Sequence, residues 1–268
     1  MSRRKIVRRT TRTLFKTVFW VFMFITVGVG TYKLTLFYYK STGQYASATA
    51  DDEKAIVKAT TDTVAVNAIF AVDGDDGRIK HLVIEIFNSG KGKIDFVTLP
   101  TDSLYGMSKE LYSILSKENP NVPQILTWKD MPQYFGQTTA YQYGTLLLKE
   151  SLEIPISFYT LMSEATFQEY FEEVKGNSLD GQSLTKGYTL KQSVCETIKA
   201  STTTLQLEKE LANYYKKVQS NLSLARRNTY LSSYLTADYD NIGVYTLQID
   251  ANTNQITDKE WVLDLIKE

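Results

Sequence analysis

The feature that most constrains this chain is an uncharged, apolar run close to its start. Residues Thr17–Tyr32 carry no charge, and the apolar character continues past Lys33 to Tyr39. This length is enough to cross a bilayer if the side chains of Lys16 and Lys33 reach toward the two interfaces. The sequence therefore predicts one transmembrane helix over residues 17–39.

The charge around this run predicts its orientation. Nine of the 30 Lys and Arg residues precede Asp51, whereas all 30 acidic residues lie from Asp51 onward. By the positive-inside rule, residues 1–16 form a basic cytoplasmic tail. We therefore expect a single-pass protein of the cell membrane whose C-terminal domain is extracytoplasmic. The alternative is a cleaved signal peptide, but the A-x-A pattern at 46–48 lies well beyond the end of the apolar run.

The part of the chain after the anchor is acidic and poor in reactive side chains. From Asp51 onward, 21 basic residues stand against 30 acidic ones, a net charge of −9. Such a domain repels nucleic acid, so DNA or RNA binding is not expected. The single Cys195 excludes an internal disulfide, and the single His81 lies in an apolar, strand-like run where a packed histidine is the expected role.

Apolar periodicity predicts an α/β domain over residues 61–268, after a polar linker over residues 40–60. Strand patterns occupy 64–72, 81–87, 93–99, 154–162 and 244–250. Helical patterns occupy 108–117, 128–135, 138–152, 165–174, 203–235 and 259–267. Strands that alternate with helices favour a central mixed β-sheet flanked by helices.

Two aspartates follow predicted strands directly, where α/β sheets place their ligand sites. Asp73 follows the run NAIFAV, and Asp102 follows KIDFVTL. Two carboxylates there would hold a hard cation such as Mg²⁺, which takes oxygen ligands. The alternative is that both are ordinary turn residues, since aspartate is common in turns.

The order of these segments resembles the LytR-CpsA-Psr family. The resemblance is carried by NAIFAVD, KIDFVTLPTDS, LEIPISFY at 152–159 and LDGQ at 179–182, and it covers roughly residues 64–235. In that family a strand ends in a G-x-D-type motif and a later one ends in P-R-D-T. The short basic tail and the single anchor are also similar.

This resemblance implies an αβα domain outside the cytoplasm. Family members transfer glycopolymers from polyprenyl-pyrophosphate carriers onto peptidoglycan. Their aspartates bind Mg²⁺, their arginines bind the pyrophosphate, and a hydrophobic pocket between sheet and helices holds the lipid tail. Asp73 and Asp102 match the motif aspartates, so the resemblance implies that both ligate the metal and that Asp102 is also catalytic.

The chain departs from the family pattern at the basic positions. Thr101 replaces the arginine of P-R-D, GRIK at 77–80 replaces a segment with a further metal-binding aspartate, and the usually arginine-rich segment 183–192 contains none. Threonine cannot reproduce a bidentate guanidinium contact with pyrophosphate. Arg78 is the candidate to enter the site. Arg226 and Arg227 would also enter it if the predicted long helix borders the site, but a solvated helix face is the favoured position for both.

Three functions stay open on the sequence. The first is a divergent glycopolymer phosphotransferase that uses Asp73, Asp102, Arg78 and Mg²⁺. The second is a non-catalytic relative that binds a polyprenyl-phosphate-linked glycan or lipid, or serves as a scaffold in envelope assembly. The third is a structural or sensory ectodomain unrelated to the family. Loss of charge-stabilising arginines should remove most phosphoryl-transfer activity, which favours the second.

Overall fold

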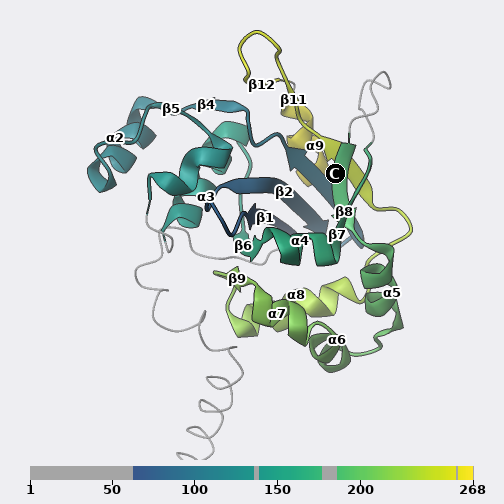
Figure 1. The fold of residues 1–268 in the computed structure, drawn as a ribbon. Helices are drawn as coiled ribbons and strands as arrows, with labels where there is room; N and C mark the ends of the chain where they lie inside the picture. Colours follow the sequence, from purple (N-terminus) through teal and green to yellow (C-terminus); the bar gives the residue numbers. More distant parts are fainter. Residues whose placement is uncertain (1–62, 136–138, 177–185, 258, 268) are drawn as a thin grey trace, which may run out of the picture. The chain divides into compact units, whose positions relative to one another are not determined.

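A computed structural model describes residues 63–135, 139–176, 186–257 and 259–267 of the chain (Figure 1). The predicted tail, the predicted membrane anchor at 17–39 and the linker at 40–60 lie outside these residues, as does the LDGQ turn at 179–182. Within the described ranges, no helix has both the length and the apolar character needed to span a bilayer.

A six-stranded sheet forms the centre of the domain, with the strand order β10-β3-β2-β1-β6-β9. Its strands are β1 (Val64–Val72), β2 (Ile79–Asn88), β3 (Lys93–Leu99), β6 (Phe158–Ser163), β9 (Gln219–Ser220) and β10 (Gly243–Thr246). Strand β2 runs antiparallel to β1 and β3, whereas β6 is parallel to β1 and β10 is parallel to β3. The prediction of a mixed sheet is confirmed.

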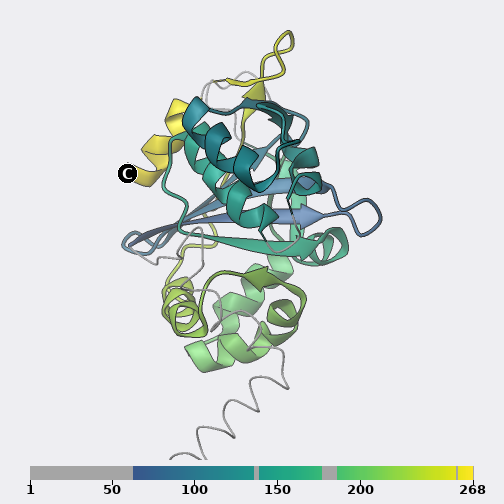
Figure 2. The ribbon, with the colours of Figure 1, turned by 90° about the vertical axis from the view of Figure 1, so that its left-hand side faces the viewer.

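Helices cover both faces of this sheet, because its central strands are buried on both sides (Figure 2). One layer comprises α2 (Lys109–Glu118), the 3-10 helix η1 (Trp128–Gln133), α3 (Ala140–Leu152) and α9 (Glu260–Lys267). The other comprises α4 (Glu164–Tyr170), α5 (Gln192–Ala200), α6 (Thr204–Glu210), α7 (Ala212–Lys217) and α8 (Leu224–Tyr234). The described chain also forms three two-stranded antiparallel sheets: β4 (Leu104–Gly106) with β5 (Ile125–Thr127), β7 (Phe171–Lys175) with β8 (Lys186–Leu190), and β11 (Gln248–Ile249) with β12 (Ile256–Thr257).

The single long helix predicted over residues 203–235 is wrong. The segment forms α6, α7 and α8, and β9 interrupts it by pairing with β6 at the edge of the sheet. The stretch QSNLS at 219–223 favours helix formation little, because serine and asparagine side chains bond to nearby backbone and compete with helix formation. Pairing with β6 then holds this stretch as a strand between α7 and α8. Ser223 then caps α8 by accepting a hydrogen bond from the Arg226 N–H.

Two shorter predictions also need correction. The helix predicted over 165–174 ends at Tyr170, and Phe171 begins β7, which bonds to β8. The strand predicted over 244–250 is divided at Leu247, whose N–H donates to the Thr98 carbonyl (3.0 Å) before β11 begins. In both cases hydrogen bonds to a distant segment override the local pattern.

The hairpin between β2 and β3 contains a glycine that no other residue can replace without strain. Gly92 has φ +63°, and a Cβ at this position would lie 2.8 Å from the carbonyl oxygen of Thr236. We therefore expect Gly92→Ala to lower the free energy of unfolding by about 1–3 kcal/mol, measured by urea denaturation.

Gly74→Ala is the matched control. A Cβ at Gly74 would meet no atom within 4 Å, so this variant should stay within about 0.5 kcal/mol of the parent chain. Equal stabilities of the two variants would contradict the close approach at Gly92.

Candidate functional site

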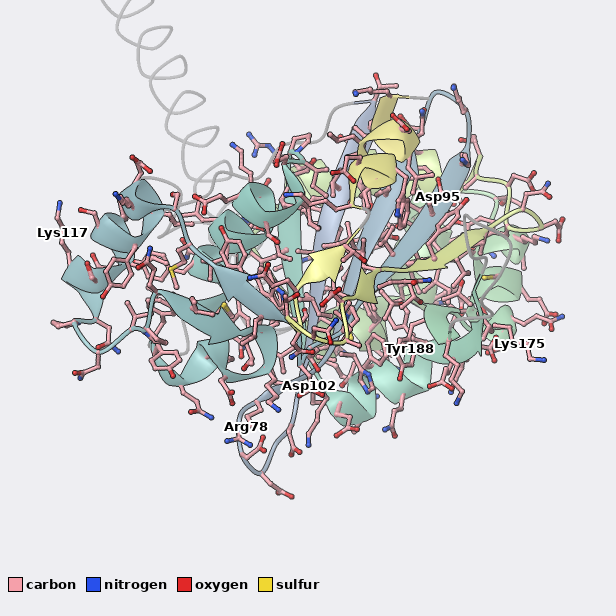
Figure 3. All side chains as sticks on the ribbon, turned by 90° about the horizontal axis from the view of Figure 1, so that it is seen from above. Arg78, Asp95, Asp102, Lys117, Lys175 and Tyr188 are labelled. Atoms are coloured by element: carbon pink, nitrogen blue, oxygen red, sulfur yellow. The ribbon has the colours of Figure 1, made fainter. Side chains whose placement is uncertain are left out.

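The two predicted metal ligands lie at the same end of the sheet, where strands β1 and β3 terminate. Asp73 follows β1 and Asp102 follows β3, and these strands run in the same direction, one on each side of β2. Seen from above, Asp102 and Arg78 lie at one end of the sheet and Asp95 lies toward the other (Figure 3). The expectation that the aspartates come at carboxyl ends of strands is confirmed.

Each of these aspartates is paired with a lysine. Lys80 Nζ lies 2.9 Å from Asp73 Oδ2, and Lys129 Nζ binds Asp102 Oδ1, although the Asp102 side chain is 69% exposed. The backbone N–H of Asp75 donates to Asp73 Oδ1 (2.8 Å), and this bond and then Lys80 lower the pKa of Asp73. To bind here, a magnesium ion would have to displace Lys80 from Asp73 and Lys129 from Asp102.

The described ranges contain no group of three or more His, Cys, Asp or Glu side chains placed to hold a metal ion. The Mg²⁺ site at Asp73 and Asp102 therefore stays a prediction. Its donor set consists of two carboxylates that are already in ion pairs.

Arg78 lies at this end of the sheet too, but its guanidinium faces acidic side chains. Its Nε is 3.2 Å from Asp130 Oδ1 and 4.0 Å from Asp76 Oδ2, and its side chain is about half exposed. Asp130 is the neighbour of Lys129 in η1, so this short helix supplies a partner to both Arg78 and Asp102. An anionic substrate would compete with Asp130 for this arginine.

The only histidine has a packing role. The His81 ring stacks on Phe167 at 4.6 Å between centroids and meets the edge of Tyr188 at 4.7 Å. Burial lowers the pKa of His81, although Glu164 lies 3.8 Å from its Nε2. The prediction of a packed histidine is confirmed.

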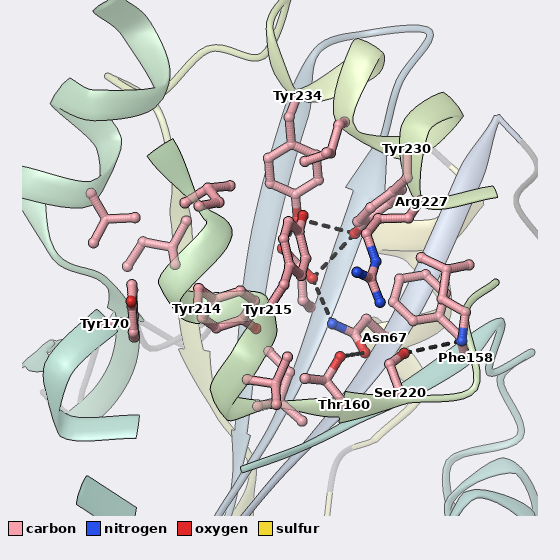
Figure 4. A pocket seen from close by; sticks show the side chains of 18 of the residues that line it. Asn67, Phe158, Thr160, Tyr170, Tyr214, Tyr215, Ser220, Arg227, Tyr230 and Tyr234 are labelled. Atoms are coloured by element: carbon pink, nitrogen blue, oxygen red, sulfur yellow. Dashed lines mark hydrogen bonds between the residues drawn. The ribbon is translucent and has the colours of Figure 1, made fainter. Parts of the chain in front are cut away.

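A pocket of about 90 Å³ lies on one face of the sheet (Figure 4). It is enclosed between strands β1, β2 and β6 and the helical layer that contains α5, α7 and α8. Aliphatic and aromatic side chains form most of its wall: Ile69, Phe158, Tyr170, Phe171, Leu190, Val194, Ile198, Leu211, Tyr214, Tyr215, Val218, Leu222, Tyr230, Leu231 and Tyr234. Five polar or charged side chains complete the lining: Asn67, Glu85, Thr160, Ser220 and Arg227. Asp73, Asp102 and Arg78 do not line it.

The polar side chains on the sheet form one hydrogen-bonded cluster. Glu85 Oε2 accepts from Asn67 Nδ2 (2.9 Å) and from the Tyr230 hydroxyl (3.1 Å), and Glu85 Oε1 accepts from the Tyr234 hydroxyl. Thr160 donates to Asn67 Oδ1 (3.1 Å). The carboxyl group therefore has three donors around it.

Burial changes the acidity of this carboxyl group. Removal from water raises the pKa of Glu85 to about 7, and the hydrogen bonds from Asn67 and Tyr230 oppose that rise. A large fraction of Glu85 is thus protonated near neutral pH.

Arg227 lies in an environment that the sequence analysis did not favour. It was expected on a solvated face, yet only 6% of it is exposed and its guanidinium lies 4.3 Å from the centre of the Tyr215 ring. Its neighbour Arg226 is exposed, as expected. The spacing of Arg227 with Tyr230, Leu231 and Tyr234 carried the signal, because residues three, four and seven apart share one helix face.

Among the comparisons with known proteins, solved structures alone give matches. No family model and no curated protein matches the sequence. Among solved structures, TagV of B. subtilis superposes with a TM-score of 0.51 at 9% identity, over 78% of this chain and 96% of TagV. TagV is a LytR-CpsA-Psr protein.

The domain has the LytR-CpsA-Psr fold. Two further structures with this fold are also similar, at TM-scores of 0.46 and 0.44. They are TagT bound to LI-WTA (11% identity, 82% of this chain and 99% of that one) and TagT with bound octaprenyl pyrophosphate lipid (13%, 82% and 96%). The likeness to TagV, together with the helical layer on each face of the sheet, shows that the expected αβα arrangement is present in this chain.

The raised pKa of Glu85 makes stability depend on pH. Between pH 4.5 and about 7 the unfolded chain ionises Glu85 while the folded chain keeps it protonated, so stability falls as pH rises through this window. In the parent chain the free energy of unfolding should therefore decline by on the order of 3 kcal/mol across this pH window. We expect Glu85→Gln to remove this decline, measured by urea denaturation at several pH values.

Glu110→Gln, on the exposed side of α2, should keep the pH dependence of the parent chain. If the free energy of unfolding of Glu85→Gln depends on pH as it does in the parent chain, Glu85 ionises as readily in the folded chain as in the unfolded one.

Proposed function

We propose that this chain is a LytR-CpsA-Psr-family cell-envelope protein that binds a polyprenyl-phosphate-linked glycopolymer, or its lipid carrier, for attachment to the cell wall. The observation that carries the proposal is the apolar pocket between the sheet and the helices. The fold shared with TagV and the order of sequence segments support it.

The chemistry of the pocket suits an isoprenoid chain. Its walls are mostly aliphatic and aromatic, and such walls favour an apolar ligand. Its volume of about 90 Å³ exceeds the roughly 10–15 Å³ that one water requires in the same measure. A segment of a prenyl chain would gain free energy there by leaving water.

The expected topology is consistent with this ligand. A helix at 17–39 would hold the domain at the outer surface of the cell membrane, where lipid-linked glycans are presented and where peptidoglycan is the acceptor. In this arrangement a carrier lipid reaches the domain without leaving the membrane surface.

Binding is favoured over transfer by the charges at the end of the sheet where β1 and β3 terminate. Asp73 and Asp102 are each paired with a lysine, and Thr101 stands where the family has an arginine. Mg²⁺-dependent transfer by Asp73, Asp102 and Arg78 remains the alternative prediction.

Filling the pocket should block the lipid. Val194 lies on the pocket side of α5, so the indole of Val194→Trp would occupy the space of the prenyl group. We expect this variant of the full-length protein, in nanodiscs, to bind farnesyl pyrophosphate at least 10-fold more weakly than the parent. Isothermal titration calorimetry measures this affinity, with empty nanodiscs as the blank.

Leu205→Trp is the matched control, since Leu205 on α6 is 76% exposed and does not line the pocket. Its affinity should equal that of the parent chain. Equal binding by Val194→Trp would place the lipid elsewhere and overturn the proposal.

Transfer has its own test. If the chain is a phosphotransferase, it releases or transfers phosphate from a polyprenyl-pyrophosphate substrate with Mg²⁺, and Asp102→Ala abolishes that turnover. Clear lipid binding with no turnover in the parent chain is the result that we expect.

A further inference from the structure

Arg227 is a buried cation without an acidic partner among the residues that the structure describes. Only 6% of the residue is exposed, and no carboxylate oxygen of the described residues lies within 4.0 Å of its guanidinium nitrogens. Its observed partner is the face of Tyr215. A guanidinium has five N–H donors, and a ring face satisfies its charge only in part.

Glu85 lines the same pocket but does not serve as this partner. Its two oxygens already accept hydrogen bonds from Asn67, Tyr230 and Tyr234. Because its pKa is raised to about 7, Glu85 also carries less than a full charge near neutral pH. It therefore neither neutralises Arg227 nor strongly repels an anion bound there.

The guanidinium points into the pocket. It lines this pocket together with Phe158, the first residue of β6, and with Asn67 and Ser220 (Figure 4). Strand β6 runs parallel to β1, so Phe158 lies opposite Asn67, whereas Ser163 lies opposite Val72 at the end where Asp73 follows. Asn67 precedes Asp73 by six residues, which separates them by roughly 20 Å along the strand.

We propose that Arg227 binds the phosphate of a prenyl phosphate in this pocket, so that the anionic group lies at the Phe158 end and not beside Asp73 and Asp102. This inference rests on the proposed function, since it assigns a position to the headgroup of the same ligand. It also assigns to α8 the cationic role for which the family motifs supply no arginine in this chain.

The environment of Arg227 favours a phosphate that is attached to a prenyl group over free phosphate. Guanidinium binds phosphate through two parallel hydrogen bonds, and an apolar, desolvated setting strengthens that contact. The wall formed by Val194, Ile198 and Leu211 would take the prenyl chain. Free phosphate would lose its water without gaining these apolar contacts.

The test compares three probes on the full-length chain in nanodiscs: farnesyl phosphate, farnesol and inorganic phosphate. We expect Arg227→Gln to lower the affinity for farnesyl phosphate about 30-fold or more, because it removes one member of a buried charge pair. The affinity for farnesol should stay unchanged. Arg226→Gln, the exposed neighbour on α8, should leave both affinities unchanged. Arg227→Lys keeps the charge but not the two-pronged contact, so an intermediate loss is expected.

The outcomes separate the two proposals. If farnesyl phosphate and farnesol bind but Arg227→Gln changes neither, the headgroup assignment is overturned while the lipid pocket stands. If neither prenyl probe binds, the proposed function fails. Inorganic phosphate that binds as tightly as farnesyl phosphate, and loses affinity in Arg227→Gln, would instead make this a free-phosphate site.

A spectroscopic measurement covers the case in which Arg227→Gln does not fold. The Nε–H resonance of Arg227 in the parent chain, assigned by its loss in Arg227→Lys, should shift on addition of farnesyl phosphate and not on addition of farnesol. An unmoved resonance under saturating farnesyl phosphate would overturn the assignment.

Discussion

The burial of β1 on both of its faces is the constraint on which the rest of the domain depends. Val66, Ala68 and Phe70 face one helical layer, while Ala65 and Ile69 face the other. Side chains alternate along a strand, so one buried strand supplies two separate cores. The domain therefore needs a helical layer on each side of the sheet, and the two layers are free to differ in character.

The two layers do differ, and the difference produces the pocket. The layer with α3 and α9 packs one continuous apolar core onto the sheet. On the opposite face, β1 and β2 present Asn67 and Glu85, which are buried polar groups that require hydrogen-bond partners. Asn67 donates to Glu85, and Tyr230 and Tyr234 of α8 donate to Glu85 as well, which ties α8 to the sheet at a spacing set by tyrosine side chains. The same helix turns Arg227 toward the space that remains.

The distribution of positive charge separates two parts of the molecule. At the end of the sheet where β1 and β3 terminate, lysines neutralise Asp73 and Asp102, and Arg78 pairs with Asp130. These pairs are partly exposed to solvent, where ion pairs contribute little stability and exchange partners readily. Arg227 is instead desolvated, a setting in which a cation interacts much more strongly with an anion. The chemistry of this domain is therefore expected to depend on the helical layer more than on the loops that the family motifs occupy.

The sequence by itself determined the α/β class, the mixed sheet, the strands β1 to β3 and the positions of Asp73 and Asp102 after two of them. These features follow from local apolar periodicity, which the chain carries within each segment. The break of the predicted helix at 203–235 depended on pairing between β9 and β6, which are about sixty residues apart. Only the tertiary structure decided that Arg227 is buried while Arg226 is exposed, because a helix face acquires its environment from the element that packs against it. Two of the three hydrogen-bond donors to Glu85, likewise, come from a helix 145 and 149 residues further along the chain. No local pattern contains that information, since the free energy of burying a charge depends on which groups the whole fold brings around it.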